Sequence, residues 1–168
     1  VALIEQEKAA GRRLLVGFDF PFAYPRGFAK ALTGQADPLA LWAWLEARIT
    51  DEKTTNNRFD LAADINLSLG GKGPFWGNAL GRDIAGLGRT KQDYSAAPFS
   101  EKRRVESLAK GSFTCWQLAG AGAVGSQVLM GLPVLSRLRR RFETDLAVWP
   151  FEISKGSDAA VVLAEIWP

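Results

Sequence analysis

The chain has 168 residues, of which 47% are hydrophobic and 23% charged, a composition typical of one globular domain that excludes a disordered or fibrous protein. It contains no histidine and only one cysteine, Cys115, which excludes Ser-His-Asp and Cys-His mechanisms, His-bound metals and a disulfide framework within this chain. The formal net charge of +3 is too small to indicate a nucleic-acid binder by itself. If the chain is an enzyme, its polar chemistry has to use Asp, Glu, Lys, Arg, Ser or backbone groups, and we then expect a hard metal ion bound by carboxylates.

The N-terminal part predicts a helix, a tight turn and a buried strand. Residues 1–10 form the helix, and Gly11 is a suitable C-terminal stop. Residues 13–20 contain an apolar run without a helical period, which indicates a buried strand ending at Asp19. This order is typical of an α/β unit.

The middle of the chain, about residues 25–142, is expected to be helical and rich in loops. Asp37 and Pro38 favour a helix start, and Ser100 is a plausible cap for a short charged helix. Gly131 and Pro133 are expected to divide one helical region into two pieces. The predicted helices span residues 38–49, 57–69, 100–110, 126–130 and 133–142.

Two closing strands are predicted near residues 145–152 and 160–167, joined by a turn from Ser154 to Asp158. The predicted fold is thus a single α/β domain, residues 1–168, with a large helical insertion between its strands. Because the chain starts at Val1 inside a helix and stops after a strand, we expect it to be a fragment of a longer protein. No apolar run of 18 residues and no signal peptide are present, so we expect a cytoplasmic protein without a membrane partner.

Asp19 is the sharpest candidate for chemistry, because it follows a buried strand. Ligands of open α/β sheets bind beyond the carboxyl ends of the strands, where a carboxylate can hold Mg²⁺ or Mn²⁺. The structural alternative is that Asp19 caps the following turn.

Glu165 is the second candidate, because it lies in an otherwise apolar strand where an unpaired charge is costly. The alternative is an outward-facing Glu on an edge strand. Glu152 has a similar setting, but Pro150 marks its strand as an edge and favours simple exposure.

The segment Gly120-Ala-Gly-Ala-Val-Gly125 matches the dinucleotide-binding pattern G-x-G-x-x-G. We find no suitable strand before it and no continuous helix after it, so this interpretation is disfavoured. A second interpretation is a phosphate site in which Ser126 and Gln127 are donors. Close packing of a helix remains the most favoured of the three.

Two basic clusters, at residues 102–104 and 137–141, could contact phosphates but are typical of solvated helix faces.

The aromatic loop from Pro74 to Gly77 could stack on a base, although a role in the core is favoured. Cys115 has no basic neighbour in sequence and is expected to be a buried thiol.

Six motifs in this order make the chain resemble a bacterial family of predicted nucleases with a ribonuclease-H-like fold, domain of unknown function family 429. Some members of this family carry molybdopterin-guanine-dinucleotide or cobalamin synthesis names. The motifs are Leu15-Val-Gly-Phe-Asp-Phe-Pro-Phe22, Gly73-Pro-Phe-Trp-Gly77, Arg103-Arg-Val-Glu106, Gly120-Ala-Gly-Ala-Val-Gly-Ser-Gln127, Trp149-Pro-Phe-Glu152 and Ala164-Glu-Ile-Trp-Pro168.

The resemblance implies a ribonuclease-H-like mixed sheet with acids on its strands. Asp19 matches the second acid of the pattern, and Glu165 matches the Glu of the last strand, with Trp167 where the family has Tyr. The acids of the family's first strand and last helix have no counterpart here. The implied mechanism is phosphoryl transfer by two Mg²⁺ or Mn²⁺ ions held by Asp19 and Glu165. Arg104, Ser126 and Gln127 are the candidates for binding substrate phosphate.

Three functions remain open at this point. The first is a metal-dependent nuclease or phosphoryl-transfer enzyme acting on nucleic acid or a nucleotide-like phosphate. The second is a catalytically inactive ribonuclease-H-like binding module, and the third is a role in cofactor biosynthesis. All of the enzymatic expectation depends on Asp19 and Glu165 converging at one edge of the sheet.

Overall fold

The computed structural model describes residues 1–92, 94–156 and 158–167. In chain order the helices are α1 (Ala2–Ala9), α2 (Phe28–Thr33), α3 (Pro38–Glu46), α4 (Arg58–Ser68), α5 (Arg104–Leu108), α6 (Val124–Phe142) and α7 (Ile153–Gly156), and the strands are β1 (Leu14–Phe18), β2 (Leu146–Trp149) and β3 (Val161–Glu165). A short 3-10 turn, Glu143–Asp145, connects α6 to β2. None of the described helices is long and apolar enough to cross a bilayer.

The three described strands form one parallel sheet in the order β1-β3-β2. The register aligns Leu14 with Val161 and Phe18 with Glu165 on one side, and Leu146 with Val161 on the other. All three strand predictions are confirmed. The described sheet is entirely parallel, whereas we expected a mixed sheet, and the link between β2 and β3 contains the short helix α7 instead of a plain turn.

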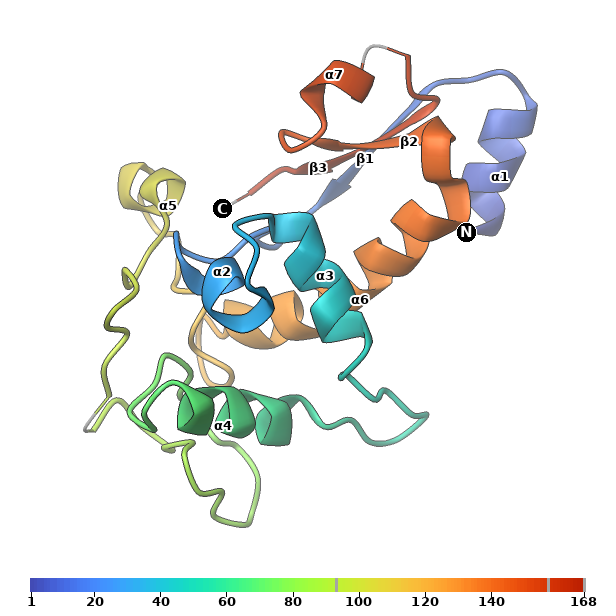
Figure 1. Cartoon of the computed structure of the whole chain (residues 1–168). Helices are drawn as coiled ribbons and strands as arrows, with labels where there is room; N and C mark the ends of the chain where they lie inside the picture. The colour runs from blue at the N-terminus through green and yellow to red at the C-terminus, as the bar shows by residue number, and fades with distance from the viewer. Residues whose placement is uncertain (93, 157, 168) are drawn as a thin grey trace.

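Figure 1 shows the sheet at one end of the molecule, with α7 above β2 and α6 below it. Residues alternate along β1, so that Val16 packs toward the core while Leu15 is 71% exposed. The helices α2 to α6 and long loops lie between β1 and β2 in sequence, in agreement with the helical and loop-rich middle that we expected.

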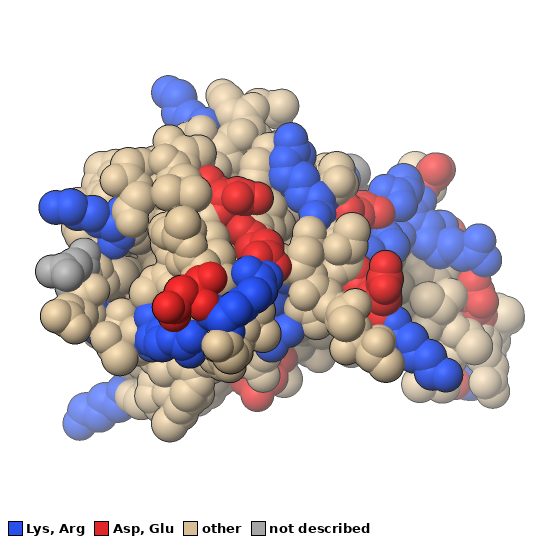
Figure 2. All heavy atoms as spheres, turned by 90° about the horizontal axis from the view of Figure 1, so that it is seen from below, with Lys and Arg blue, Asp and Glu red and all other residues tan. Residues whose placement is uncertain are grey.

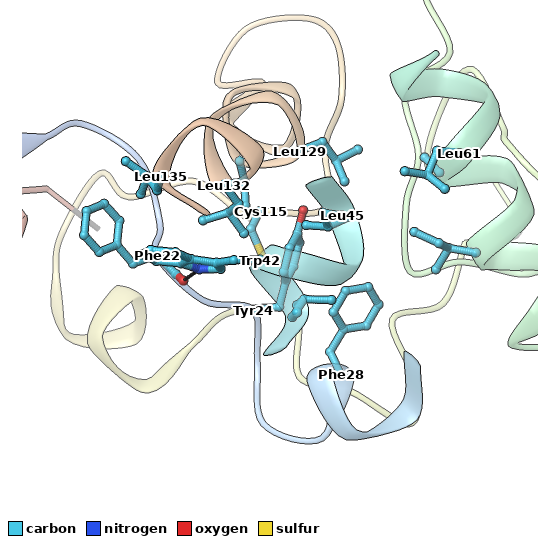
Figure 3. Packing of buried hydrophobic residues seen from close by; sticks show 14 of the residues in the cluster. Phe22, Tyr24, Phe28, Trp42, Leu45, Leu61, Cys115, Leu129, Leu132 and Leu135 are labelled. Atoms are coloured by element: carbon cyan, nitrogen blue, oxygen red, sulfur yellow. Dashed lines mark hydrogen bonds between the residues drawn. The ribbon is translucent and has the colours of Figure 1, made fainter. Parts of the chain in front are cut away.

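The core lies among the helices beside the sheet and is rich in aromatic rings. Tyr24 stacks on Trp116 with ring centroids 5.0 Å apart, and Phe28 and Phe75 contact the same indole. The indole N–H of Trp42 donates to the carbonyl of Phe22 at 2.7 Å, which satisfies a polar group inside the core (Figure 3). Phe75 therefore belongs to the core, as favoured from the sequence.

The helix α6 is continuous over 19 residues, so the predicted break at Gly131 and Pro133 is wrong. Pro133 removes one backbone donor, but it is buried among Leu129 and Leu132, and the packing of this helix outweighs a local cost of about 3 kcal/mol. Gly131 has a packing role, because a Cβ there would lie 2.4 Å from the ring of Phe20.

The helices α3 and α5 are capped in different ways. At α3, the carboxylate of Asp37 accepts a hydrogen bond from the backbone of Leu39 at 2.9 Å, and Pro38 is the first helical residue, as predicted. At α5, the helix starts at Arg104, so Ser100 does not cap it. The cap there is supplied by Glu106, which reaches back to the backbone N–H of Arg103.

Candidate functional site

The register of β1 and β3 brings the two predicted acids to the same edge of the sheet. Glu165 is the last residue of β3 and lies opposite Phe18, and Asp19 follows Phe18 directly. The pairing continues past the strands, because Ile166 N–H donates to the carbonyl of Phe18 at 3.1 Å. Paired residues of a parallel sheet share a face, so Glu165 is on the face of Phe18. Successive side chains of a strand alternate between the two faces, so Asp19, the residue after Phe18, continues this alternation on the opposite face.

The carboxylate of Glu165 is fully engaged by protein groups. Arg103 donates to both of its oxygens, with Nη1 2.9 Å from Oε2 and Nη2 bound to Oε1. The backbone N–H of Phe22 donates to Oε2 at 2.8 Å. The Glu165 side chain is only 14% exposed, so the predicted outward-facing alternative does not hold.

Arg103 holds a second carboxylate as well. Its Nε donates to Glu106 Oε1 at 2.7 Å, and its backbone N–H donates to Glu106 Oε2 at 2.6 Å. The side chains of Arg103 and Glu106 are 12% and 0% exposed. Burial opposes the charge of Arg103, but hydrogen bonds and charge attraction from Glu165, together with Glu106, outweigh it and raise the pKa of Arg103 above its usual range.

This cluster of Glu106, Arg103 and Glu165 is the part of the site that sequence reasoning missed. We expected residues 102–104 to form a solvated face, yet Arg103 is nearly buried. The available signal was the spacing of Arg103 and Glu106, because residues three apart meet on a helix and a Glu at the third helical position can complete a cap. No local pattern linked Arg103 to Glu165, which lies 62 residues away.

Asp19 has a different environment at the same edge. Its side chain is exposed, and no other described residue makes a hydrogen bond or ion pair with its carboxylate, so we find no capping role for it. It lines a pocket of about 180 Å³ together with Phe20, Phe113, Gln127 and Trp167. Neither Glu165 nor Arg103 lines this pocket.

Of the three predicted phosphate contacts, one lies in this pocket. Gln127 is in the first turns of α6 and faces the same space as Asp19. Ser126 is engaged elsewhere, since its hydroxyl donates to the carbonyl of Leu118 at 2.6 Å and accepts from Arg58 Nε at 3.0 Å. Arg104 is exposed on α5 and does not line the pocket.

The glycine-rich segment at the start of α6 is explained in part by packing. A Cβ at Gly125 would lie 2.6 Å from the carbonyl oxygens of both Cys115 and Gln117. Gly122 has φ +76°, and a Cβ there would lie 2.2 Å from the ring of Phe113. The segment from Cys115 to Leu118 is outside the three-stranded sheet, so the strand that a dinucleotide site requires is not found among the described strands.

The basic cluster at the end of α6 is largely neutralised by ion pairs. Arg139 bonds to Glu152, Arg140 bonds to Glu46, and Arg141 bonds to Glu5. On the face seen in Figure 2, basic and acidic side chains are mixed without a large area of one sign. This face therefore offers no continuous basic track for a nucleic-acid backbone.

Larger hollows of about 420 and 600 Å³ lie along α6, but none of the predicted site residues lines them.

Cys115 is buried, and burial raises the pKa of its thiol well above the ordinary value, which fits the structural role expected for it.

The donor set limits the metal chemistry that this edge can support. Within the described part of the chain, no group of three or more His, Cys, Asp or Glu side chains is placed to hold an ion. A pair of ions bridged by Asp19 and Glu165 does not fit, because both Glu165 oxygens are bound to Arg103. A single Mg²⁺ fits better, since this ion is commonly held by one or two carboxylates, water and substrate phosphate.

Comparisons of the chain with family models, with curated proteins and with solved structures gave no match. The residues at this end of the sheet are therefore the basis on which the function is inferred.

Proposed function

We propose that the pocket at Asp19 is a Mg²⁺- or Mn²⁺-dependent phosphoryl-transfer site, with a nucleotide-like phosphate ester or nucleic acid as substrate. The observation that carries the proposal is the carboxylate of Asp19, which has no hydrogen bond or ion pair to another described residue and shares one pocket with Gln127 at the carboxyl end of β1. This is the position where open α/β sheets bind ligands. A cytoplasmic nuclease with a ribonuclease-H-like fold is the specific form of the proposal, and it is supported by the six motifs.

Each residue has a defined task in this proposal. Asp19 supplies the carboxylate oxygens for one cation. The cation, when bound, neutralises phosphate charge and lowers the pKa of an attacking water. Gln127 donates an amide N–H to a phosphate oxygen, and the N-terminal end of α6, which has no side-chain cap, adds a favourable dipole for the anion.

Glu165 acts through Arg103 in this scheme. Direct binding of a cation by Glu165 would require Arg103 to leave both of its carboxylate oxygens. While the pair is closed, Glu165 holds Arg103 in place and is a positioning residue. Arg104 stays a predicted phosphate contact on the exposed face of α5.

A second candidate function is a binding module without catalysis. The observation that favours it is the closed Arg103–Glu165 pair, because a carboxylate neutralised by a bidentate Arg is a weak metal ligand. In this case the edge of the sheet would bind a phosphorylated ligand and leave it unchanged.

The cation is tested first, by titrating the protein with Mn²⁺ and following free Mn²⁺ by electron paramagnetic resonance. Asp19→Asn should weaken binding by more than about tenfold, because even residues outside the ligand shell of a metal often cost that much. The matched control is Asp64→Asn, which changes an exposed Asp on α4. Equal Mn²⁺ affinity in wild type and Asp19→Asn would contradict the proposal.

The reaction is tested with labelled single-stranded RNA and DNA in the presence of Mg²⁺ or Mn²⁺. Cleavage by the wild type and its loss in Asp19→Asn, with activity kept in Asp64→Asn, are the expected results. Mn²⁺ binding without cleavage of any phosphate ester would favour the binding module.

A further inference from the structure

The pocket beside Asp19 has aromatic walls as well as polar groups. Phe113, Trp167 and Phe20 line it, and Phe113 and Trp167 are 51% and 53% exposed. Apolar side chains that are exposed singly are ordinary at a protein surface, whereas a group of them rimmed by polar residues is typical of a binding site. Two exposed aromatic side chains at one pocket, next to an amide and a carboxylate, indicate a ligand-binding site.

The two exposed rings differ from the other aromatic residues near them in having no aromatic partner among the described residues. Among the described residues, neither Phe113 nor Trp167 makes a ring contact with another aromatic side chain. The remaining aromatic residues of this region do pair, as Phe20 does with Phe18 at 5.6 Å and with Phe22 at 5.9 Å. Because Phe113 and Trp167 are about half exposed, each keeps apolar surface that a flat ligand can cover.

The pocket is also built on rigid supports. Phe113 packs directly against Gly122, where any side chain would overlap its ring. Phe20 is fixed in the same way against Gly131 of α6. Rings held by backbone contacts of this kind bind a ligand without first losing side-chain freedom, which favours affinity.

The polar groups of the pocket match the edge of a heterocycle. Gln127 carries an amide that can donate and accept at the same time, and it has no hydrogen bond to another described residue. A Gln amide makes paired hydrogen bonds with a base edge such as that of adenine. Stacking on aromatic side chains tolerates every base, and the amide adds a preference among them.

We propose that this pocket binds the nucleobase of the substrate, stacked on Phe113 and Trp167 and hydrogen-bonded by Gln127. This inference deepens the proposed function and rests on it, because it assigns the substrate class of the same edge: a phosphate ester that carries a base. The base can come from a free nucleotide or from an unpaired position in a single strand, since both present the same ring.

The test uses adenosine with ribose as its control, in the presence of EDTA, so that neither a cation nor a phosphate contributes. Calorimetry on the wild type should show saturable binding of adenosine and none of ribose. Trp167→Ala should weaken adenosine binding on the order of 10- to 100-fold, the range for loss of one stacking partner. The matched control is Trp149→Ala, since Trp149 is 54% exposed at the end of β2 and should leave binding unchanged.

A second variant and a second pair of ligands complete the test. Phe113→Ala should also weaken adenosine binding, while circular dichroism verifies that both variants stay folded. Tighter binding of a single-stranded adenylate octamer than of AMP assigns the pocket to a strand, and the reverse assigns it to a free nucleotide.

The failure of this inference is separate from that of the proposed function. Failure of adenosine to bind, or equal affinity in wild type and Trp167→Ala, overturns the base pocket even if Asp19→Asn abolishes Mn²⁺ binding. Conversely, adenosine binding that is sensitive to Trp167 supports the base pocket even if Asp19 holds no cation.

Discussion

Two carboxylates at the same end of the sheet, Glu165 and Asp19, have opposite environments. Glu165, at the end of β3, is 14% exposed and bound to Arg103 and to the backbone of Phe22. Asp19, just past the end of β1, is exposed, and its carboxylate has no hydrogen bond to another described residue. The first arrangement stabilises the fold, and the second leaves a charge available for a ligand.

This difference follows from what surrounds each side chain. Glu165 shares its face of the sheet with buried residues such as Leu163, where an unpaired charge would be very costly, and so a partner is required. Asp19 faces solvent, where water satisfies its charge at little cost. A residue that is free of structural partners can be used for binding without loss of stability.

Arg103→Ala should produce the largest effect. It leaves the carboxylates of Glu106 and Glu165 nearly buried without their counter-charge, and breaking such a cluster costs about 3–5 kcal/mol. Urea denaturation measures the free energy of unfolding. Arg104→Ala, the adjacent exposed residue, is the control and should change stability by about 0.5 kcal/mol or less. Similar losses in both variants would show that the cluster contributes nothing special.

Glu165→Gln should cost less, about 2 kcal/mol, because the amide oxygen can still accept from Phe22 while the charge-assisted bonds from Arg103 are lost. Thermal and urea unfolding both report this change. If Glu165 is mainly a cation ligand, the variant would instead keep its stability and lose Mn²⁺ affinity, which would reverse the assignment of the two acids.

Gly125→Ala should cost about 1–2 kcal/mol, since the new methyl group meets two backbone carbonyl oxygens that cannot easily move. The new methyl group also displaces the start of α6 and with it Gln127. The affinity for adenosine should therefore fall together with the free energy of unfolding. Gly81→Ala is a suitable control, because a Cβ there has no neighbour within 4 Å and its φ is not positive. Wild-type stability in Gly125→Ala would show that the close contact of Gly125 with the two carbonyl oxygens does not stabilise the start of α6.

Asp19→Asn should have the smallest effect on stability, within about 0.5 kcal/mol of wild type, because its carboxylate has no partner among the described residues. A loss above 1.4 kcal/mol, a factor of ten in the unfolding equilibrium, would mean that Asp19 is structural after all. Unfolding in urea at neutral pH measures it directly.

Much of the fold was predictable because local patterns carry it. The apolar runs defined β1, β2 and β3, and the Asp37-Pro38 pair located the start of α3. The continuity of α6 was not predictable, because Pro133 argues locally for a break and only the packing of its neighbours against the core overrides it. The parallel pairing of β2 with β3 was also hidden, since a short connection usually indicates a hairpin.

The candidate site was predictable only in part, for a similar reason. The ends of strands pointed to Asp19 and Glu165, and the helix start pointed to Gln127. The partner of Glu165 comes from 62 residues away, and so no pattern in the sequence could identify Arg103 for that task. The aromatic border of the pocket joins Phe20, Phe113 and Trp167 from three distant segments, which only the folded chain brings together.

The position of β1 has a practical consequence for handling the purified chain. Within the described sheet, β1 has β3 on one side only, and Leu15 is exposed on it. An edge strand of this kind can pair with a strand of another molecule, so aggregation at high concentration should begin at β1. The substitution Leu15→Lys would place a charge on this edge strand and should slow aggregation of concentrated samples.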